Sequence, residues 1–369
     1  MRVNSLQLTD FRNYESFCGA FPEQVVIFRG ANAQGKTNVL EALYLLALGK
    51  SHRTHREREL IRWQTPFSIL KAEMARDGRT HRLEVVLSGK GKKVKRNGVE
   101  QRRLSDYIGT LNAVMFAPED LAIVKGSPGM RRRFLDVAIS QVKPAYVHHL
   151  SRYNQILAQR NNLLKNLRRT SGGEVLLEVL NEQLVASGVE VFLKRRHFIR
   201  KLETWAQTIQ SQITNEQETL ALTYRTFLAE DEIEPTELAD MYHEQLKKRR
   251  ASERERGLTL VGPHRDDVAF AVNGIDVQTF GSQGQQRTTA LSLKLAEIEL
   301  IFEEIGEYPI LLLDDVLSEL DESRQTHLLQ TIRQKVQTFV TTTSTADIHV
   351  GALKQAAIYD VESGKVRKA

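Results

Sequence analysis

The chain has a single cysteine, Cys18, among its 369 residues, which excludes an internal disulfide and a cysteine-cluster metal site. Its ten histidines form no ligand-spaced pair of the HExxH kind. No apolar run approaches the roughly 20 residues of a membrane-spanning helix. The first residues also lack a basic region followed by an apolar stretch. We therefore expect a cytoplasmic protein with no membrane partner.

Acidic residues are fewer than basic ones, and the shortfall is local. The formal net charge is +6 and the pI is near 9.3, which favours a polyanionic partner. Residues 127–213 hold 14 Lys/Arg against 6 Asp/Glu, so this stretch carries more than the whole excess of positive charge.

Hydrophobic periodicity divides the chain into three parts. Residues 1–117 and the residues after Gly257 alternate between strand and helix patterns, whereas residues 118–256 have long helical periodicity. The expected helices are Asn38–Leu48, Arg131–Leu167, Glu174–Ile213, Met241–Glu255 and Gly284–Ile305. The expected strands are Val3–Leu8, Val25–Arg29, Phe67–Ala75, Arg82–Leu87, Ala113–Phe116, Leu258–Val261, Val268–Val272, Ile310–Asp314 and Thr338–Thr341, with a basic hairpin at Gly91–Gly98. The pattern predicts an α/β head built from residues 1–117 and 257–369, with residues 118–256 inserted as a helical arm.

A glycine-rich loop predicts a nucleotide site. It fits the pattern G-x-x-x-x-G-K-[ST], follows the apolar strand Val25–Arg29 and opens a helix at Asn38. Glycines let backbone N–H groups curl around phosphates, and the helix N-terminus adds its positive dipole end. Lys36 is expected on the β- and γ-phosphates of ATP, and the Thr37 hydroxyl on Mg²⁺. The expected nucleotide-binding residues here are Gly30, Ala31, Asn32, Ala33, Gln34, Gly35, Lys36, Thr37 and Asn38.

The apolar segment Pro309–Leu313 ends in two acids, Asp314 and Asp315. Buried carboxylates are costly unless they are paired or linked to a metal, so this strand end is expected to be catalytic rather than a simple cap. Asp314 is expected to hold Mg²⁺ through water, and Asp315 to polarise the attacking water.

Further segments carry a family resemblance. Gly281–Arg287 (GSQGQQR) opens a helix before the acidic strand, Val316–Asp321 (VLSELD) follows that strand, and Gly262–Asp267 (GPHRDD) precedes both. Together they resemble the signature loop, second acidic motif and dimer-interface loop of ABC/SMC-type ATPase heads. The whole chain resembles the RecF family of bacterial recombinational-repair ATPases more closely. The segments that match this family in order are LQLTDFRNY at 6–14, GKSHRT at 49–54, APEDL at 117–121 and RRRFLD at 131–136.

The resemblance implies a mechanism and partners. Ser282 would meet the γ-phosphate held by a second protomer, so that ATP joins two heads head-to-tail and hydrolysis releases them. A serine at a glycine-rich helix start is itself an anion site, which agrees with this role. Arg12 and Arg53 would contact the nucleotide by family position. The implied activity is a weak, DNA-stimulated ATPase that binds single- and double-stranded DNA and gaps, helps to load RecA with RecO and RecR, and acts in replication-fork maintenance and SOS induction.

The chain departs from the commoner pattern of these heads at four places. Its signature is SQGQ instead of SGGQ, Asp315 replaces a longer glutamate, and Pro118-Glu119 stands where a metal-linked glutamine is usual. Thr342-Thr343-Ser344, without a histidine, follows the strand Thr338–Thr341, so a hydroxyl is expected to take the place of the histidine at the γ-phosphate. The shorter acid predicts slow turnover.

Basic residues in two regions are the candidate DNA contacts. With little aromatic interleaving, they are expected to bind phosphates without base readout. They are Lys92, Lys93, Lys95 and Arg96 on the hairpin, then Arg131, Arg132, Arg133, Arg168, Arg169 and Lys194–Arg196.

Three other classes fit less well. A transporter ATPase subunit would have a shorter separation between Lys36 and Ser282. A structural SMC protein would need a far longer arm with sustained heptads. A nuclease fused to such a head would need a further metal-dependent domain.

Overall fold

The computed structural model describes all residues except 168–170, 228–233, 318–323, 326–327, 329–334 and 344–355. It contains two compact units. Unit 1 comprises residues 1–120, 209–216 and 290–369, and unit 2 comprises residues 121–208 and 217–289. Both ends of the chain lie in unit 1. Residues 257–289, which the sequence pattern assigned to the head, belong to unit 2.

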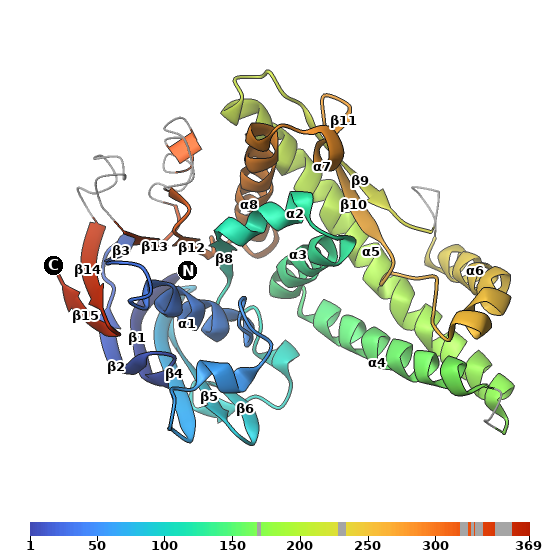
Figure 1. The fold of residues 1–369 in the computed structure, drawn as a ribbon, viewed down its shortest axis with the longest axis horizontal. Coiled ribbons are helices and arrows are strands. Elements are labelled where there is room, and N and C mark those ends of the chain that lie inside the picture. Colours follow the sequence, from blue (N-terminus) through green and yellow to red (C-terminus); the bar gives the residue numbers. More distant parts are fainter. Residues whose placement is uncertain (168–170, 228–233, 318–323, 326–327, 329–334, 344–355) are drawn as a thin grey trace. The chain divides into compact units, whose positions relative to one another are not determined.

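A largely parallel sheet forms the centre of unit 1, in the order β15-β14-β3-β13-β12-β8 (Figure 1). Strand β13 pairs in parallel with β3 on one side and with β12 on the other. Because carboxyl ends of parallel strands meet at one edge, the residues after β3, β12 and β13 are brought together there. The strands are β3 (Val25–Arg29), β8 (Ala113–Phe116), β12 (Ile310–Asp314), β13 (Thr338–Thr342), β14 (Ala356–Glu362) and β15 (Lys365–Lys368).

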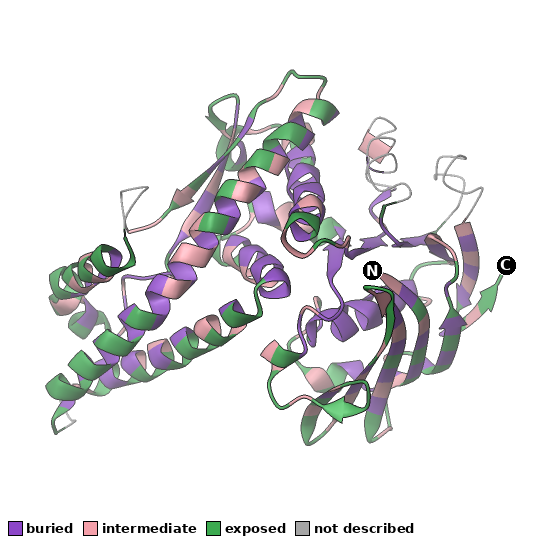
Figure 2. Ribbon diagram, turned by 180° about the vertical axis from the view of Figure 1, so that it is seen from behind, coloured by how far each residue is buried: buried purple, intermediate pink, exposed green. Residues whose placement is uncertain are grey.

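Unit 1 also has an antiparallel sheet in the order β2-β1-β4-β5-β6-β7. Helix α1 (Lys36–Leu48) contacts β8, β12 and β13 of the first sheet and β4 and β5 of the second. It is therefore covered on both sides, and nearly all its residues are buried (Figure 2). A helix buried all round needs apolar side chains on every face, as in its sequence KTNVLEALYLLAL. The strands are β1 (Arg2–Phe11), β2 (Tyr14–Ala20), β4 (Phe67–Arg76), β5 (Arg79–Ser88), β6 (Gly91–Arg96) and β7 (Val99–Glu100).

Unit 2 consists mainly of helices with a small antiparallel sheet in the order β11-β10-β9. The helices are α2 (Leu121–Lys125), α3 (Pro128–Val142), α4 (Pro144–Asn166), α5 (Gly173–Ile213, whose last residues lie in unit 1), α6 (Pro235–Arg256), α7 (Val277–Phe280) and α8 (Gln283–Ile305, which continues into unit 1). The strands are β9 (Leu220–Arg225), β10 (Asp267–Val272) and β11 (Ile275–Asp276).

Two expectations from the sequence are wrong in this unit. The single helix expected over Arg131–Leu167 is two helices, because Pro144 disfavours helical geometry at Lys143, which has φ −129° and ψ 85°. The strand expected at Leu258–Val261 is irregular backbone. Within the described part of the chain, every helix is too short or too polar to span a lipid bilayer.

Candidate functional site: a phosphate-binding loop beside two acids

The glycine-rich loop joins β3 to α1 and is fixed from several sides. Gly35 has φ 110°, and a Cβ there would lie 2.5 Å from the Asn13 side chain, so only glycine fits. The backbone carbonyl of Gln34 accepts hydrogen bonds from Asn13 Nδ2 at 2.9 Å and from the Gly364 amide at 3.1 Å. The Gln34 side chain accepts one from the Ser363 amide at 2.7 Å. The loop is therefore held by both the β1–β2 and the β14–β15 turns.

Lys36 begins α1 and is 7% exposed. Its ammonium donates hydrogen bonds to the carbonyls of Gly30 at 2.6 Å and Ala31 at 3.0 Å. Burial lowers the pKa of this ammonium, while the nearby charges of Asp315 and Asp314 act in the opposite direction. A phosphate in the loop would replace these two neutral carbonyls as the hydrogen-bond partner of the Lys36 ammonium and would give it a negatively charged partner.

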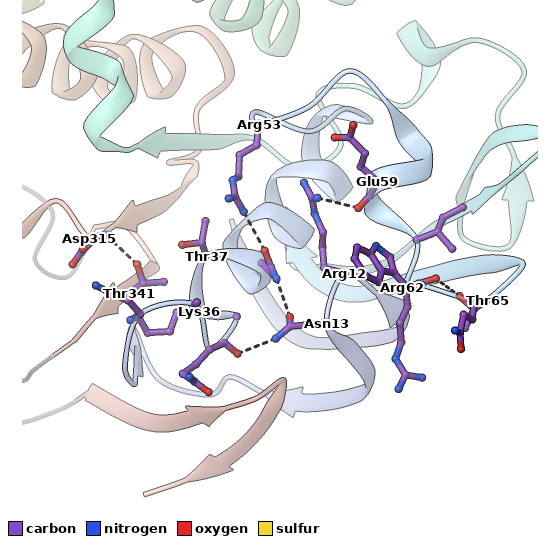
Figure 3. Close-up of a pocket in the computed structure, with 18 residues that line it drawn as sticks. Arg12, Asn13, Lys36, Thr37, Arg53, Glu59, Arg62, Thr65, Asp315 and Thr341 are labelled. Atoms are coloured by element: carbon purple, nitrogen blue, oxygen red, sulfur yellow. Dashed lines mark hydrogen bonds between the residues drawn. The ribbon is translucent and has the colours of Figure 1, made fainter.

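The loop and the acidic strand meet at a direct hydrogen bond. Thr37 Oγ1 donates to Asp314 Oδ1 at 2.8 Å, and the Thr341 hydroxyl donates to the same oxygen at 2.7 Å. Asp315 N–H donates to the Thr341 hydroxyl at 3.0 Å. Thr341 therefore links the two acids, and Figure 3 shows its hydrogen bond with Asp315. Sequence reasoning placed Thr341 in a strand but gave it no role.

Asp315 has φ 53°, a left-handed conformation that is uncommon for residues other than glycine, asparagine and aspartate. It directly follows β12, and its side chain lines the same cavity as Lys36 and Thr37. The geometry fits a carboxylate held in place to orient a small reactant such as water.

A buried glutamate that the sequence analysis missed anchors the other wall. Glu41 on α1 is fully buried and accepts two hydrogen bonds of 2.8 Å from the Arg12 guanidinium and one of 2.5 Å from Ser51 Oγ. Burial alone would raise the pKa of Glu41, but the hydrogen bonds from Arg12 and Ser51 hold it below its usual value. Arg12 has φ 53° and also donates to the Glu59 carbonyl.

Arg53 continues this wall through a chain of side chains. It donates to Asn38 Oδ1 at 3.2 Å, and Asn38 Nδ2 donates to Asn13 Oδ1 at 2.8 Å. Asn13 in turn reaches Gln34 of the loop (Figure 3). Arg12 and Arg53 both line the cavity, and both are oriented by residues of α1; their contact with the nucleotide stays a prediction.

The cavity has a volume of about 1010 Å³, which is ample for a nucleotide. Loop residues from Asn32 to Asn38 line it, together with Arg12, Arg53, Asp315 and Thr341. Gly30 and Ala31 lie at the base of the loop, where Lys36 binds their carbonyls. Within the described residues, no cluster of three His, Cys, Asp or Glu could hold a metal. The hydroxyl of Thr37 and the carboxylate of Asp314 instead fit Mg²⁺, which prefers few protein oxygens completed by water and phosphate.

Ser282 lies at the start of α8 and is exposed. Its Oγ accepts from the Gln285 amide at 3.2 Å, while Gln285 Oε1 accepts from the Ser282 amide at 3.0 Å. This reciprocal pair is a capping box. It leaves the serine and the helix N-terminus facing solvent. Of the motif VLSELD at 316–321, residues 318–321 fall outside the described part of the chain, as do Arg168, Arg169 and Ser344.

The basic hairpin has a different setting from the one expected. Each of its three lysines pairs with an acid: Lys92 with Glu57 at 2.6 Å, Lys93 with Glu100 at 3.3 Å, and Lys95 with Glu84 at 2.6 Å. The hydrogen bond that Lys95 donates to the Glu84 carboxylate raises the pKa of Lys95. Arg96 makes a long contact of 3.5 Å with Thr110 Oγ1. These side chains stay at the surface, but their charge is partly neutralised.

Arg131 is a correction to the DNA-contact set. It is 2% exposed, and its guanidinium binds both oxygens of Asp267 at 2.6 and 2.9 Å. It therefore holds α3 to β10 and does not face solvent. Arg195, of the Lys194–Arg196 run, is also buried, with Asp136 at 2.8 Å.

Arg132 and Arg133 remain partly exposed, and Arg132 donates to the Asp266 carbonyl. Part of the positive charge of residues 127–213 thus serves internal packing.

Fold and site together define an ATPase head of the ABC/SMC type. A family model described as the RecF/RecN/SMC N terminal domain matches residues 2–367. The DNA replication and repair protein RecF of Halalkalibacterium halodurans is 53% identical over 369 residues, which cover 100% of both chains. The protein of the same name from Bacillus subtilis strain 168 is 53% identical over 370 residues, again 100% of both. The chain belongs to the RecF family of DNA replication and repair proteins.

A solved structure extends the comparison to the fold. It is described as the recombination mediator protein RecF with ATP in the RecFOR pathway. It is 33% identical, covers 100% of this chain and 97% of its own, and has a TM-score of 0.92.

Proposed function

We propose that this protein is an ATP-dependent DNA-binding ATPase of recombinational repair, in which ATP acts as a switch. The observation that carries the proposal is the hydrogen bond between Thr37 of the phosphate loop and Asp314 of the acidic strand. It joins a phosphate cradle to a metal-binding carboxylate. The solved relative with bound ATP supports the same interpretation.

In this proposal Lys36 and the loop amides bind the β- and γ-phosphates. Thr37 and Asp314 hold Mg²⁺, which neutralises phosphate charge when bound. Asp315 orients the attacking water and accepts its proton. An aspartate side chain is shorter than that of a glutamate, so ATP hydrolysis is slow. DNA stimulates hydrolysis by stabilising the ATP-bound dimer.

Ser282 acts in trans. Ser282 is exposed at the start of α8, and the γ-phosphate held by a second protomer is the partner we propose for its hydroxyl. ATP then joins two copies head-to-tail, whereas ADP, which lacks that phosphate, does not. Hydrolysis separates them.

The nucleic-acid partner is single- or double-stranded DNA, including gaps, bound through phosphates. Candidate contacts are Lys92, Lys93, Lys95, Arg96, Arg132 and Arg133. Membership of the RecF family, with a relative described as a mediator in the RecFOR pathway, supports RecO and RecR as partners and RecA loading, fork maintenance and SOS induction as the role.

Light scattering tests the switch. Wild-type protein is measured with ADP, ATP and a non-hydrolysable analogue, with and without gapped DNA. The expected result is a dimer with ATP or the analogue and a monomer with ADP. Lys36→Ala should lose both nucleotide binding and the dimer, whereas Ser282→Arg should bind ATP as a monomer. Dimerisation of Ser282→Arg with ATP would remove Ser282 from the shared site.

A further inference from the structure

One large apolar side chain at the nucleotide cavity is not packed into the protein core. Trp63 is 91% exposed, although tryptophan is among the residues that gain most from burial. It lines the same cavity as the phosphate loop, on the Arg62–Thr65 segment. An exposed indole on the wall of a binding cavity indicates a ligand surface.

The turn that carries Trp63 is built to hold it there. Both the amide and the hydroxyl of Thr65 donate to the Arg62 carbonyl, at 3.3 and 2.9 Å, and Gln64 between them has φ 65°. The tight turn projects the residue at its second position away from the main chain. Figure 3 shows Arg62 and Thr65 on the opposite side of Arg12 from Lys36 and Thr37.

The turn is also fixed to the strands that support the phosphate loop. The Arg62 amide donates to the Asp10 carbonyl at 2.9 Å, and the Arg12 amide donates to the Leu60 carbonyl at 2.9 Å. The Arg62 guanidinium pairs with Asp10 at 3.4 Å and with Glu15 at 3.2 Å. These contacts fix the backbone of the Trp63 turn relative to the β1–β2 turn, whose Asn13 binds the phosphate loop.

We propose that Trp63 is the base-stacking plate of the site, covering the purine ring of the nucleotide whose phosphates the loop binds. This inference rests on the proposed nucleotide function. A single cavity of about 1010 Å³ joins the two ends, with phosphate-binding groups at the loop and an apolar surface, Ile61 and Trp63, at the turn. Stacking on an aromatic ring needs only the flat face of a base, so ATP and GTP should share this contact and UTP, with its smaller ring, should make a weaker one.

A contact between Trp63 and a second protomer is the competing explanation. The two differ in their nucleotide dependence. Base stacking needs only the nucleoside and one bound nucleotide, so ADP should produce it in a monomer. A contact across a dimer should need ATP and should depend on protein concentration.

Tryptophan fluorescence tests the inference directly. The chain has two tryptophans, Trp63 and Trp205, so Trp205→Phe leaves Trp63 as the only indole. ADP should quench its emission at every protein concentration, whereas inorganic tripolyphosphate, which fills the loop without a base, should not. Unchanged emission with bound ADP, or equal quenching by tripolyphosphate, would overturn the proposal. So would quenching that appears only with ATP and grows with protein concentration.

Affinity gives a second, independent measurement. Trp63→Ala should weaken ADP binding by about tenfold or more and leave tripolyphosphate binding unchanged, while Trp63→Phe should retain most of the affinity. Equal ADP affinity in the alanine variant would refute the stacking role. Because Trp63 is exposed, the Trp63→Ala variant without nucleotide should unfold at the same temperature as the wild-type protein. If wild-type protein binds neither ADP nor tripolyphosphate, the proposed nucleotide function fails, and that result is distinct from a stacking failure.

Discussion

The hydroxyl of Thr341 donates a 2.7 Å hydrogen bond to Asp314 and accepts one of 3.0 Å from the amide of Asp315. One buried side chain therefore sets the position of the carboxylate proposed for Mg²⁺ and of the backbone that carries the proposed base. Strand β13, which supplies Thr341, lies between the strands that supply the loop and the acids.

Thr341→Val should slow ATP hydrolysis by about tenfold or more while leaving ADP affinity without Mg²⁺ near wild type. Valine keeps the shape of the side chain but removes the hydroxyl that accepts a hydrogen bond from the Asp315 amide. Removing one partner of a buried hydrogen bond costs about 1–3 kcal/mol of free energy. Single-turnover kinetics across a Mg²⁺ series checks this. Thr341→Ser is the matched control and should retain most activity. An unchanged rate in the valine variant would show that Thr341 does not position the acids.

Glu41→Gln should lower both the stability of unit 1 and nucleotide affinity. The amide cannot balance the charge of Arg12, and replacing one partner of a buried ion pair costs on the order of 3 kcal/mol. Denaturant unfolding gives the stability change, and ADP titration gives the affinity. A comparison with Arg12→Gln separates the two effects. If Glu41 acts on the site only through Arg12, the double variant should bind ADP no worse than the Arg12 variant.

Asp266→Asn should change how stability depends on pH. Burial raises the pKa of Asp266 from 3.8 to about 6, so the unfolded chain ionises this carboxyl before the folded protein does. Its contribution to stability is complete below pH 3.8 and is lost as pH rises to about 6. That loss is about 3 kcal/mol for a shift of about two pKa units.

The stability of the asparagine variant relative to wild type should therefore rise between about pH 4 and 6 and then level off. Burial lowers the pKa of His264 to about 4, which acts in the opposite sense in both proteins, so only the difference between them is informative. Urea unfolding at several pH values measures it. A difference that is constant with pH would contradict the raised pKa.

The hairpin ion pairs allow a test of DNA binding in both directions. Changing Lys92, Lys93 and Lys95 to glutamine should weaken binding to DNA of any sequence. It should also reduce the slope of log affinity against log salt by about 0.9 for each phosphate that is no longer neutralised. Changing the partners Glu57, Glu84 and Glu100 to glutamine releases the lysines and should strengthen binding. Fluorescence anisotropy over a salt series measures both, and unchanged affinity in both variants would exclude the hairpin.

Much of the nucleotide site was predictable because it is local in sequence. The strand Val25–Arg29, the loop and its helix form one continuous pattern, and β3 and β8 have the bounds expected. The acidic strand was also predictable, since an apolar run ending in Asp314 and Asp315 is difficult to explain otherwise.

The rest depends on contacts between distant segments. A single glutamate in an apolar helix gives no sign that Arg12 and Ser51 will neutralise it, and nothing local pairs Arg131 with Asp267. Strands β2, β7, β9, β11, β14 and β15 were missed. Strands β7, β11 and β15 have four residues or fewer, while β2, β9 and β14 mix polar and apolar residues, so pairing with neighbouring strands decides their structure. The place where Pro144 divides a helical pattern was readable from proline chemistry and was overlooked.

The β14–β15 turn grips the phosphate loop through Gln34, and at Gly364 a Cβ would lie 2.4 Å from the Asn13 carbonyl. Nucleotide binding to the loop should consequently strengthen the attachment of the β14–β15 hairpin, and loss of that attachment should weaken nucleotide binding. Limited proteolysis that cuts between residues 356 and 369 would then slow when nucleotide is added, reporting on the pocket from a part of the chain that never touches the ligand.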